Sequence, residues 1–275
     1  MRIVILSSQP FSGASSVTAQ CLEHLEQWGV TVDVVLPGTL VNITDLALTA
    51  DLYLLKSPND HVVGVATALE AAGARCVNPV SVVRTCRDRI AVTGVLAAAG
   101  VPVPPTWTTA ELPGIVDLLD QGPVMLKSGR VGASMGHRTI WDEEDLASAH
   151  QPGQQWLVQR LQHTEDRDRK LYRIGDQVFG VKRRWPAATE ADKQGEPFTV
   201  SAEHRRICDA AAEALGTDLF GLDLIETAEG PLVVDVHPFP GFKGVPNGAL
   251  RLADYLFARL HDEPHVATAH QESAP

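Results

Sequence analysis

Two aspartates in segments that otherwise look like buried strands are the residues best suited to chemistry. Asp223 lies in the apolar run 220–225, and Asp235 lies in the run 232–237, where strand alternation puts it on the same face as His237. A buried carboxylate is costly unless it is paired or binds a metal. Two carboxylates and a third polar group that meet across a hairpin suit a hard divalent cation. A structural pair with Lys or Arg is the alternative, and the spacing alone leaves both open.

A lysine at the end of a predicted strand is followed by a loop that contains three glycines. Lys127 ends the strand 123–127 and the loop spans residues 129–136, so a point charge and backbone N–H groups could meet phosphates there. The loop includes Gly132-Ala-Ser134-Met-Gly136, which matches the nucleophile motif of hydrolases. That motif requires a strand directly before the serine and a helix after it, whereas residues 137–141 look like a strand. We therefore reject a hydrolase, and a plain hairpin turn remains the alternative.

Basic residues are concentrated between positions 167 and 184 of a chain whose formal net charge is −11. Lys170 and Arg183 are separated by one short predicted hairpin, so their charges could converge on an anion. A solvated charged face is the commoner fate of such a run. The apolar residues 178–181 favour a partly buried strand instead.

The composition limits the partners and the compartment. An acidic chain lacks the general basic face that nucleic-acid binding needs, so we expect no nucleic-acid partner. The apolar stretches are interrupted well before the ~20 residues that span a bilayer, so we expect no membrane insertion. The four cysteines form no CxxC pair, which favours free thiols in a reducing compartment and a cytoplasmic protein.

The elements that must position these residues fall into two patterns. Before residue 80, strands predicted at 2–6, 30–36, 51–55 and 75–77 alternate with helices, which indicates a parallel sheet of the α/β class with helices on both faces. No GxGxxG follows the first strand, so a dinucleotide site is not expected. After residue 80 we expect one helix at 84–99 and an α+β region. That region contains an antiparallel set of strands at 155–161, 170–174 and 177–182, and then a hairpin at 220–236.

Taken in order, these pieces resemble the ATP-grasp superfamily. They are most similar to its ribosomal-protein glutamate ligase-like (RimK-like) branch and to its inositol-trisphosphate kinase branch, and the likeness is densest from Arg87 to Pro246. The resemblance implies an ATP-grasp fold. Its parts would be an N-terminal parallel α/β domain at 1–83, a central lid domain at 84–155, a C-terminal nucleotide-binding domain at 156–262 and a flexible tail at 263–275.

The resemblance also assigns roles to individual residues. Lys127 would contact the α- and β-phosphates, the loop at 132–136 would close over them, and residues 159–161 would line the adenine slot. Asp223, Asp235 and His237 would hold the metal, and Arg183 would act in catalysis by stabilising the transferred phosphoryl group or an acyl phosphate. The residues placed around the nucleotide are Arg89, Lys127, Gly132, Ala133, Ser134, Gln159, Arg160, Leu161, Asp168 and Lys170.

The implied activity is an ATP- and Mg²⁺-dependent ligation of a small-molecule or peptide carboxylate to an amine. It would proceed through an acyl phosphate and release ADP and phosphate, with two Mg²⁺ ions as cofactors and Mn²⁺ as an alternative. A small-molecule kinase and a non-catalytic nucleotide-binding module remain open, as does a homodimer. Three positions depart from the family pattern, with Arg89 in place of Lys, Arg160 in place of an acid and His237 in place of Asn.

Overall fold

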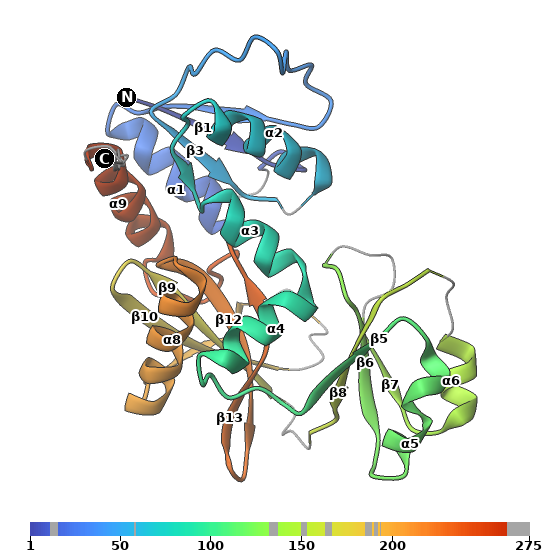
Figure 1. Ribbon diagram of the computed structural model, residues 1–275. Helices are drawn as coiled ribbons and strands as arrows, with labels where there is room; N and C mark the ends of the chain where they lie inside the picture. Colours follow the sequence, from blue (N-terminus) through green and yellow to red (C-terminus); the bar gives the residue numbers. More distant parts are fainter. Residues whose placement is uncertain are drawn as a thin grey trace, which may run out of the picture.

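The computed structural model describes residues 1–11, 16–57, 59–131, 137–149, 153–162, 167–184, 189, 192 and 194–262. The predicted phosphate-loop residues Gly132, Ala133 and Ser134 lie outside these ranges, as does the predicted tail at 263–275. The described residues form three sheets, and Figure 1 shows the middle one (green) to one side of the other two.

The N-terminal sheet is parallel, as the alternating strand and helix pattern predicts. Its strand order is β2-β1-β3-β4, and β3 is buried along its whole length, as is typical of a parallel strand covered on both faces. Its elements are β1 (Arg2–Leu6), α1 (Val17–Gln27), β2 (Thr31–Val35), β3 (Leu52–Leu55), α2 (Asp60–Ala71) and β4 (Cys76–Val77).

Two short helices connect this sheet to the next, where the sequence predicts one helix at 84–99. That prediction is wrong, because α3 (Val80–Arg87) begins earlier and ends before Asp88, which has extended backbone angles of φ −94° and ψ 101°. The Asp88 side chain accepts hydrogen bonds from the backbone N–H groups of Ile90 and Ala91 and so caps α4 (Arg89–Ala98). The break makes Arg89 the first residue of α4.

The central sheet is antiparallel, with the order β5-β8-β6-β7 and a hydrophobic core of its own around Trp156. The strand predicted at 155–161 joins this sheet, so its placement in one set with the strands at 170–182 is wrong. The domain limits remain a prediction. The central sheet includes β8 and so extends to Arg160, beyond the predicted end of the central domain at residue 155. The elements are β5 (Thr106–Thr109), η1 (Leu112–Ile115), α5 (Val116–Leu119), β6 (Val124–Ser128), β7 (His137–Ile140), α6 (Glu143–Ala149) and β8 (Trp156–Arg160).

The C-terminal sheet is antiparallel, in the order β11-β10-β9-β12-β13. On one face it shares a core with α4 and α8, and on the other with α9 and the N-terminal sheet. Its elements are β9 (Arg167–Ile174), β10 (Gln177–Arg184), β11 (Glu196–Phe198), α8 (Ala202–Leu215), β12 (Leu219–Thr227), β13 (Gly230–His237) and α9 (Gly248–His261).

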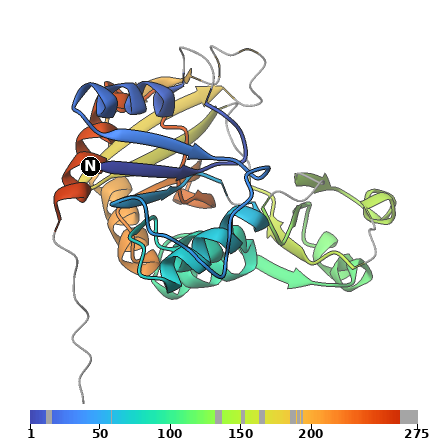
Figure 2. The same ribbon diagram turned by 90° about the horizontal axis from the view of Figure 1, so that it is seen from above.

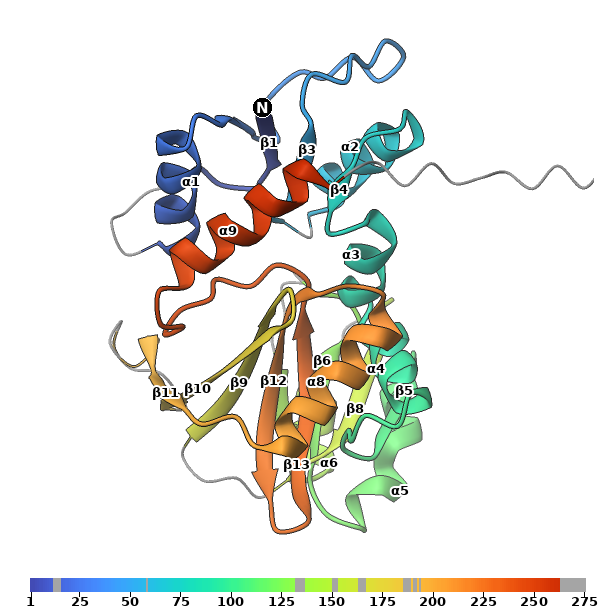
Figure 3. The same ribbon diagram turned by 90° about the vertical axis from the view of Figure 1, so that its left-hand side faces the viewer.

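Helix α9 packs between the first and last thirds of the chain. In Figure 3 it lies between the N-terminal sheet and the C-terminal sheet, and its residues Leu252 and Leu256 belong to the same buried cluster as Ile5 and Leu54. The central sheet has a separate core and projects from this body when the molecule is seen from above (Figure 2). In the part of the chain that the structure describes, no helix has both the length and the apolar character needed to cross a membrane.

Candidate active site

Most of the charged residues singled out in the sequence lie on one face of the C-terminal sheet. Lys170 of β9 is the register partner of Asp223 of β12, and Asp223 is the partner of Asp235 of β13, so the three lie in a row across three strands. Side chains two positions apart share a strand face, which adds Asp168 and His237 to the same side. The antiparallel pairing therefore brings together residues that are up to 69 positions apart in the chain.

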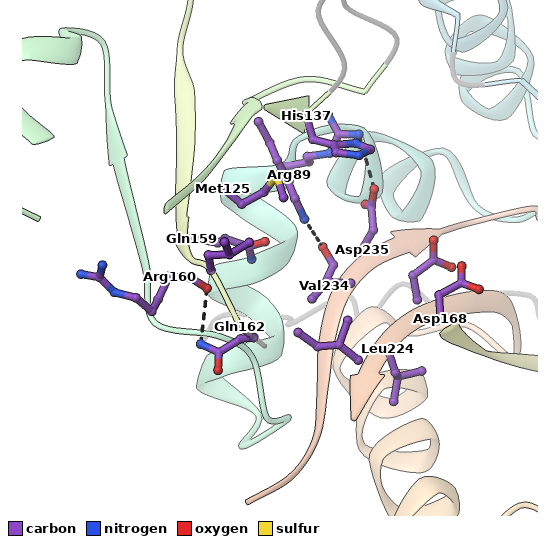
Figure 4. Close-up of a pocket in the computed structure, with 14 residues that line it drawn as sticks. Arg89, Met125, His137, Gln159, Arg160, Gln162, Asp168, Leu224, Val234 and Asp235 are labelled. Carbon is purple, nitrogen blue, oxygen red and sulfur yellow. Dashed lines mark hydrogen bonds and ion pairs between the residues drawn. The ribbon is translucent and has the colours of Figure 1, made fainter. Parts of the chain in front are cut away.

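A cavity of about 240 Å³ lies between the central and the C-terminal sheets. Apolar side chains form two opposite walls, and Figure 4 shows Met125 on one side and Leu224 and Val234 on the other. The acids Asp168, Asp223 and Asp235 line it together with Lys127. A slot with apolar walls and a polar end suits a flat ring that carries an anionic group.

A β-bulge shapes one wall of this cavity. Asp223 pairs with Asp235 and Leu224 pairs with Val233, so Val234 has no partner on β12. The freed Val234 carbonyl accepts a hydrogen bond of 2.8 Å from Lys127 Nζ on β6. Burial lowers the pKa of Lys127 to about 8, although the charge of Asp235 opposes the shift.

Asp223 is the most strongly paired acid of the site. Its Oδ1 forms an ion pair with Lys170 Nζ, and its Oδ2 lies 3.2 Å from His237 Nε2. Burial raises the pKa of Asp223, but the charges and hydrogen bonds of His237 and Lys170 outweigh burial and hold that pKa well below its usual range. Burial lowers the pKa of His237, and the attraction of Asp223 outweighs it in turn, so the pKa of His237 is raised.

Asp235 is held by Arg89 and by its own strand. Arg89 Nη2 lies 3.4 Å from Asp235 Oδ2, an approach that Figure 4 also shows, and the Val236 N–H donates to Asp235 Oδ1 at 2.9 Å. Arg89 also donates to the backbone carbonyl of Ser128, directly before the glycine loop. Arg89 thus joins α4 to both β6 and β13.

The two carboxylates fit a hard divalent cation that completes its coordination with phosphate oxygens, and the His237 imidazole adds a nitrogen donor to this set. In the described part of the chain, no three His, Cys, Asp or Glu side chains gather into a ready-made metal site. Asp235 faces Arg89 and Asp223 faces Lys170. The assignment of Asp223, Asp235 and His237 as metal ligands therefore stays a prediction.

The predicted adenine slot consists of buried amide and backbone groups. Gln159 is only 3% exposed, and its Nε2 donates to Thr106 Oγ1. Arg160 turns its guanidinium away from the cavity, as Figure 4 shows, and donates to the carbonyls of Leu118 and Gly122 while it lies over the Trp107 ring. Arg160 therefore faces the cavity with its backbone, while Leu161 lines the cavity beside it.

The predicted catalytic residue Arg183 lies one strand away from the cavity. Its guanidinium forms a 2.9 Å ion pair with Asp168, which does line the cavity. Burial lowers the pKa of Arg183, but the hydrogen bond and charge of Asp168 outweigh it, so that pKa is raised and the charge is retained. A role for Arg183 in catalysis stays a prediction.

Six residues that line the cavity were not among the predicted site residues: Met125, His137, Gln162, Leu224, Ile225 and Val234. Met125 could have been found, because it lies two positions before Lys127 and so shares its strand face. His137 is the register partner of Lys127, but this pairing crosses the glycine loop. Val234 is exposed to the cavity by the bulge, for which the sequence carries no evident signal.

Comparison with known proteins agrees with this geometry. Residues 86–255 match the family model described as the RimK-like ATP-grasp domain. The probable alpha-L-glutamate ligase of Xylella fastidiosa (strain M12) is 28% identical over 209 residues, covering 69% of this chain and 67% of that protein. The corresponding protein of Stenotrophomonas maltophilia (strain K279a) is 29% identical over 202 residues, covering 64% and 65%. The match thus spans about two thirds of these relatives.

Solved structures with the same arrangement confirm the predicted ATP-grasp fold. A RimK domain protein ATP-grasp from Sphaerobacter thermophilus DSM 20745 has a TM-score of 0.78 at 20% identity, covering 93% of this chain and 99% of that one. D-alanine–D-alanine ligase from Bacillus anthracis has a TM-score of 0.69 at 14% identity, covering 94% and 98%. At these identities the likeness concerns the fold alone.

Proposed function

Because this chain belongs to the RimK-like ATP-grasp family, we propose that it is an ATP-dependent ligase that joins a carboxylate to an amine. The carboxylate would be activated as an acyl phosphate, and the amine would then displace phosphate, with ADP as the other product. The observation that carries the proposal is the pairing of Asp223 with Asp235 at the polar end of a cavity whose other walls are apolar.

The cavity supports a specific pose for the nucleotide. The base would lie between the wall that contains Met125 and Leu161 and the wall that contains Leu224 and Val234. Lys127 Nζ, held at the Val234 carbonyl, would then meet the phosphates with its positive charge. Asp223 and Asp235 would face the terminal phosphates, where the transferred group leaves ADP.

Asp223, Asp235 and His237 would hold Mg²⁺, and we propose two ions, with Mn²⁺ as an alternative. When bound, the metal supplies positive charge that neutralises the phosphate oxygens during transfer. Lys170 and Arg183 are already placed on the same sheet face by their pairs with Asp223 and Asp168. They would balance the charge of the acyl phosphate on the side away from the base.

The substrate class follows from the relatives, which are named probable alpha-L-glutamate ligases. We propose L-glutamate as the amine substrate and a small-molecule or peptide carboxylate as the acceptor. A homodimer and a cytoplasmic location remain predictions, which sedimentation analysis and cell fractionation would test.

Product analysis tests this function. A panel of carboxylates is tested with and without L-glutamate. We expect ADP release only when a carboxylate and L-glutamate are both present, and we expect an amide product in the mass spectrum. A stable phosphorylated product from a single acceptor would indicate a kinase instead. Tight ATP binding without ADP formation across acid, amine and polyol panels would indicate a non-catalytic module.

A further inference from the structure

The imidazole of His237 lies next to a carboxylate oxygen of Asp223, and the two atoms are about as far apart as two ligands of one metal ion. The separation between His237 Nε2 and Asp223 Oδ2 is 3.2 Å. Two ligands at right angles, each about 2.1 Å from a metal ion, lie about 3 Å apart. An ion placed between these atoms therefore needs only a small adjustment of either side chain.

The other oxygen of Asp223 is already engaged. Lys170 Nζ contacts Oδ1, and Lys170 is buried in the sheet, so Oδ2 is the oxygen of this carboxylate that faces His237. Asp235 lies two positions before His237 on the same strand face. The imidazole therefore lies on the same side of the sheet as both carboxylates.

The backbone after His237 is anchored from the N-terminal part of the molecule. Asn78 donates from its side chain to the Pro238 carbonyl, and Lys56 Nζ donates to the Phe239 carbonyl at 2.8 Å. These contacts fix the end of β13, which carries the imidazole, at the centre of the structure rather than on a free loop. A ligand on a rigid element holds its geometry better than one on a loop.

We propose that His237 is a metal ligand that makes this site select Mn²⁺ over Mg²⁺ when nucleotide is bound. Mg²⁺ requires near-ideal octahedral oxygen coordination. Mn²⁺ shares the preference for carboxylate oxygens, but as a first-row transition-metal ion it accepts an imidazole nitrogen more readily than Mg²⁺ does. The inference rests on the proposed function, because it assumes that the site binds a metal–nucleotide complex. The ion would replace the hydrogen bond between Nε2 and Oδ2 and would contact both atoms.

The test uses the full chain with Mn²⁺ and adenylyl imidodiphosphate, which is not hydrolysed. Electron spin-echo spectroscopy of bound Mn²⁺ should show coupling to an imidazole nitrogen, and His237→Asn should remove it. In competition with Mg²⁺, the Mn²⁺/Mg²⁺ affinity ratio should be at least tenfold lower in His237→Asn than in the wild type. Changes to residues that support a metal ligand lower metal affinity by about 10–100-fold, which sets this scale. Circular dichroism would verify that the variant is folded.

Two matched variants control for other imidazoles. His204 Nε2 lies 3.0 Å from Glu226 Oε1, a similar pair outside the cavity, so His204→Asn should leave the coupling and the ratio unchanged. His137 lines the cavity itself, so His137→Asn should retain the coupling if His237 is its source.

The outcomes separate this inference from the proposed function. Mn²⁺ that binds with nucleotide but shows no nitrogen coupling, or a ratio unchanged in His237→Asn, would overturn the selection by His237 and leave the ligase proposal standing. Failure of the wild-type protein to bind the metal–nucleotide complex at all would overturn both.

Discussion

Lys127 Nζ donates a 2.8 Å hydrogen bond to the backbone carbonyl of Val234, 107 positions later in the chain. Val234 lies in the β12–β13 bulge, opposite no residue of β12, so its carbonyl is available to a side chain from the central sheet. The bond joins the two walls of the cavity next to Asp235. A displacement of the central sheet would therefore move the positive charge relative to the paired acids.

Asp235→Asn should lower Mg²⁺-dependent ATP turnover by at least about 100-fold, on the scale of losing one electrostatic stabiliser of a transition state. The amide keeps the shape of the carboxylate but not its charge, so the thermal unfolding curve should change little. Steady-state ADP release measures the effect. Asp254→Asn on the exposed side of α9 is the matched control, and wild-type turnover in Asp235→Asn would remove Asp235 from the metal site.

Nucleotide affinity should fall as the pH rises through about 8. Burial lowers the pKa of Lys127 to about 8, so below that pH the ammonium is charged and attracts the phosphates. Above it the free protein has lost this proton and must take it up again on binding, which weakens affinity by up to about tenfold per pH unit. Calorimetric titration with the Mg²⁺ complex of a non-hydrolysable ATP analogue between pH 7 and 9.5 measures the trend.

Lys127→Arg provides the control for this titration, because the guanidinium stays charged throughout the range. Its affinity should be lower than that of the wild type at pH 7 but nearly independent of pH. A wild-type affinity that does not change between pH 7 and 9.5 would contradict the assignment of Lys127 to the phosphates.

Asn78→Ala should reduce the free energy of unfolding by about 1–3 kcal/mol, the cost of leaving a buried hydrogen-bonding group without a partner. Asn78 is 1% exposed and donates to the carbonyls of Leu219 and Pro238, while Thr217 donates to its Oδ1. Urea unfolding measures the loss. Asn42→Ala, at an exposed residue, should change stability by less than about 0.5 kcal/mol, and an equal effect of both variants would refute the argument.

Asp88→Ala should destabilise the protein by about 0.5–2 kcal/mol, because α4 loses the side-chain cap of its first turn. The Michaelis constant for ATP should also rise, since Arg89 begins the same helix and reaches both Ser128 and Asp235. Asp88→Asn should restore both properties, because asparagine caps helices about as well as aspartate. Failure of the asparagine variant to restore them would point to the charge of Asp88 rather than its cap.

The sequence by itself indicated most of the local elements and the nearness of the two acids. Apolar runs ending near Gly29 and Gly73 predict the parallel sheet, because helices and strands differ in the spacing of their apolar residues. The hairpin around residues 228–230 brings Asp223 and Asp235 near each other, because in a short hairpin the turn sets the register. Their direct pairing depends on the bulge after Asp223, which shifts the register by one residue and which the sequence does not indicate.

Only the tertiary structure decided how distant segments meet. The strand at residues 156–160 pairs with β5 and β6, and the Arg160 guanidinium turns to Trp107 and the carbonyl of Leu118. The helix expected at 84–99 breaks at Asp88, although its apolar pattern continues. These outcomes depend on which surfaces are buried together and which polar groups then need partners. The residues that are adjacent in the chain do not indicate either. The contact between Lys127 and Val234 is of this kind.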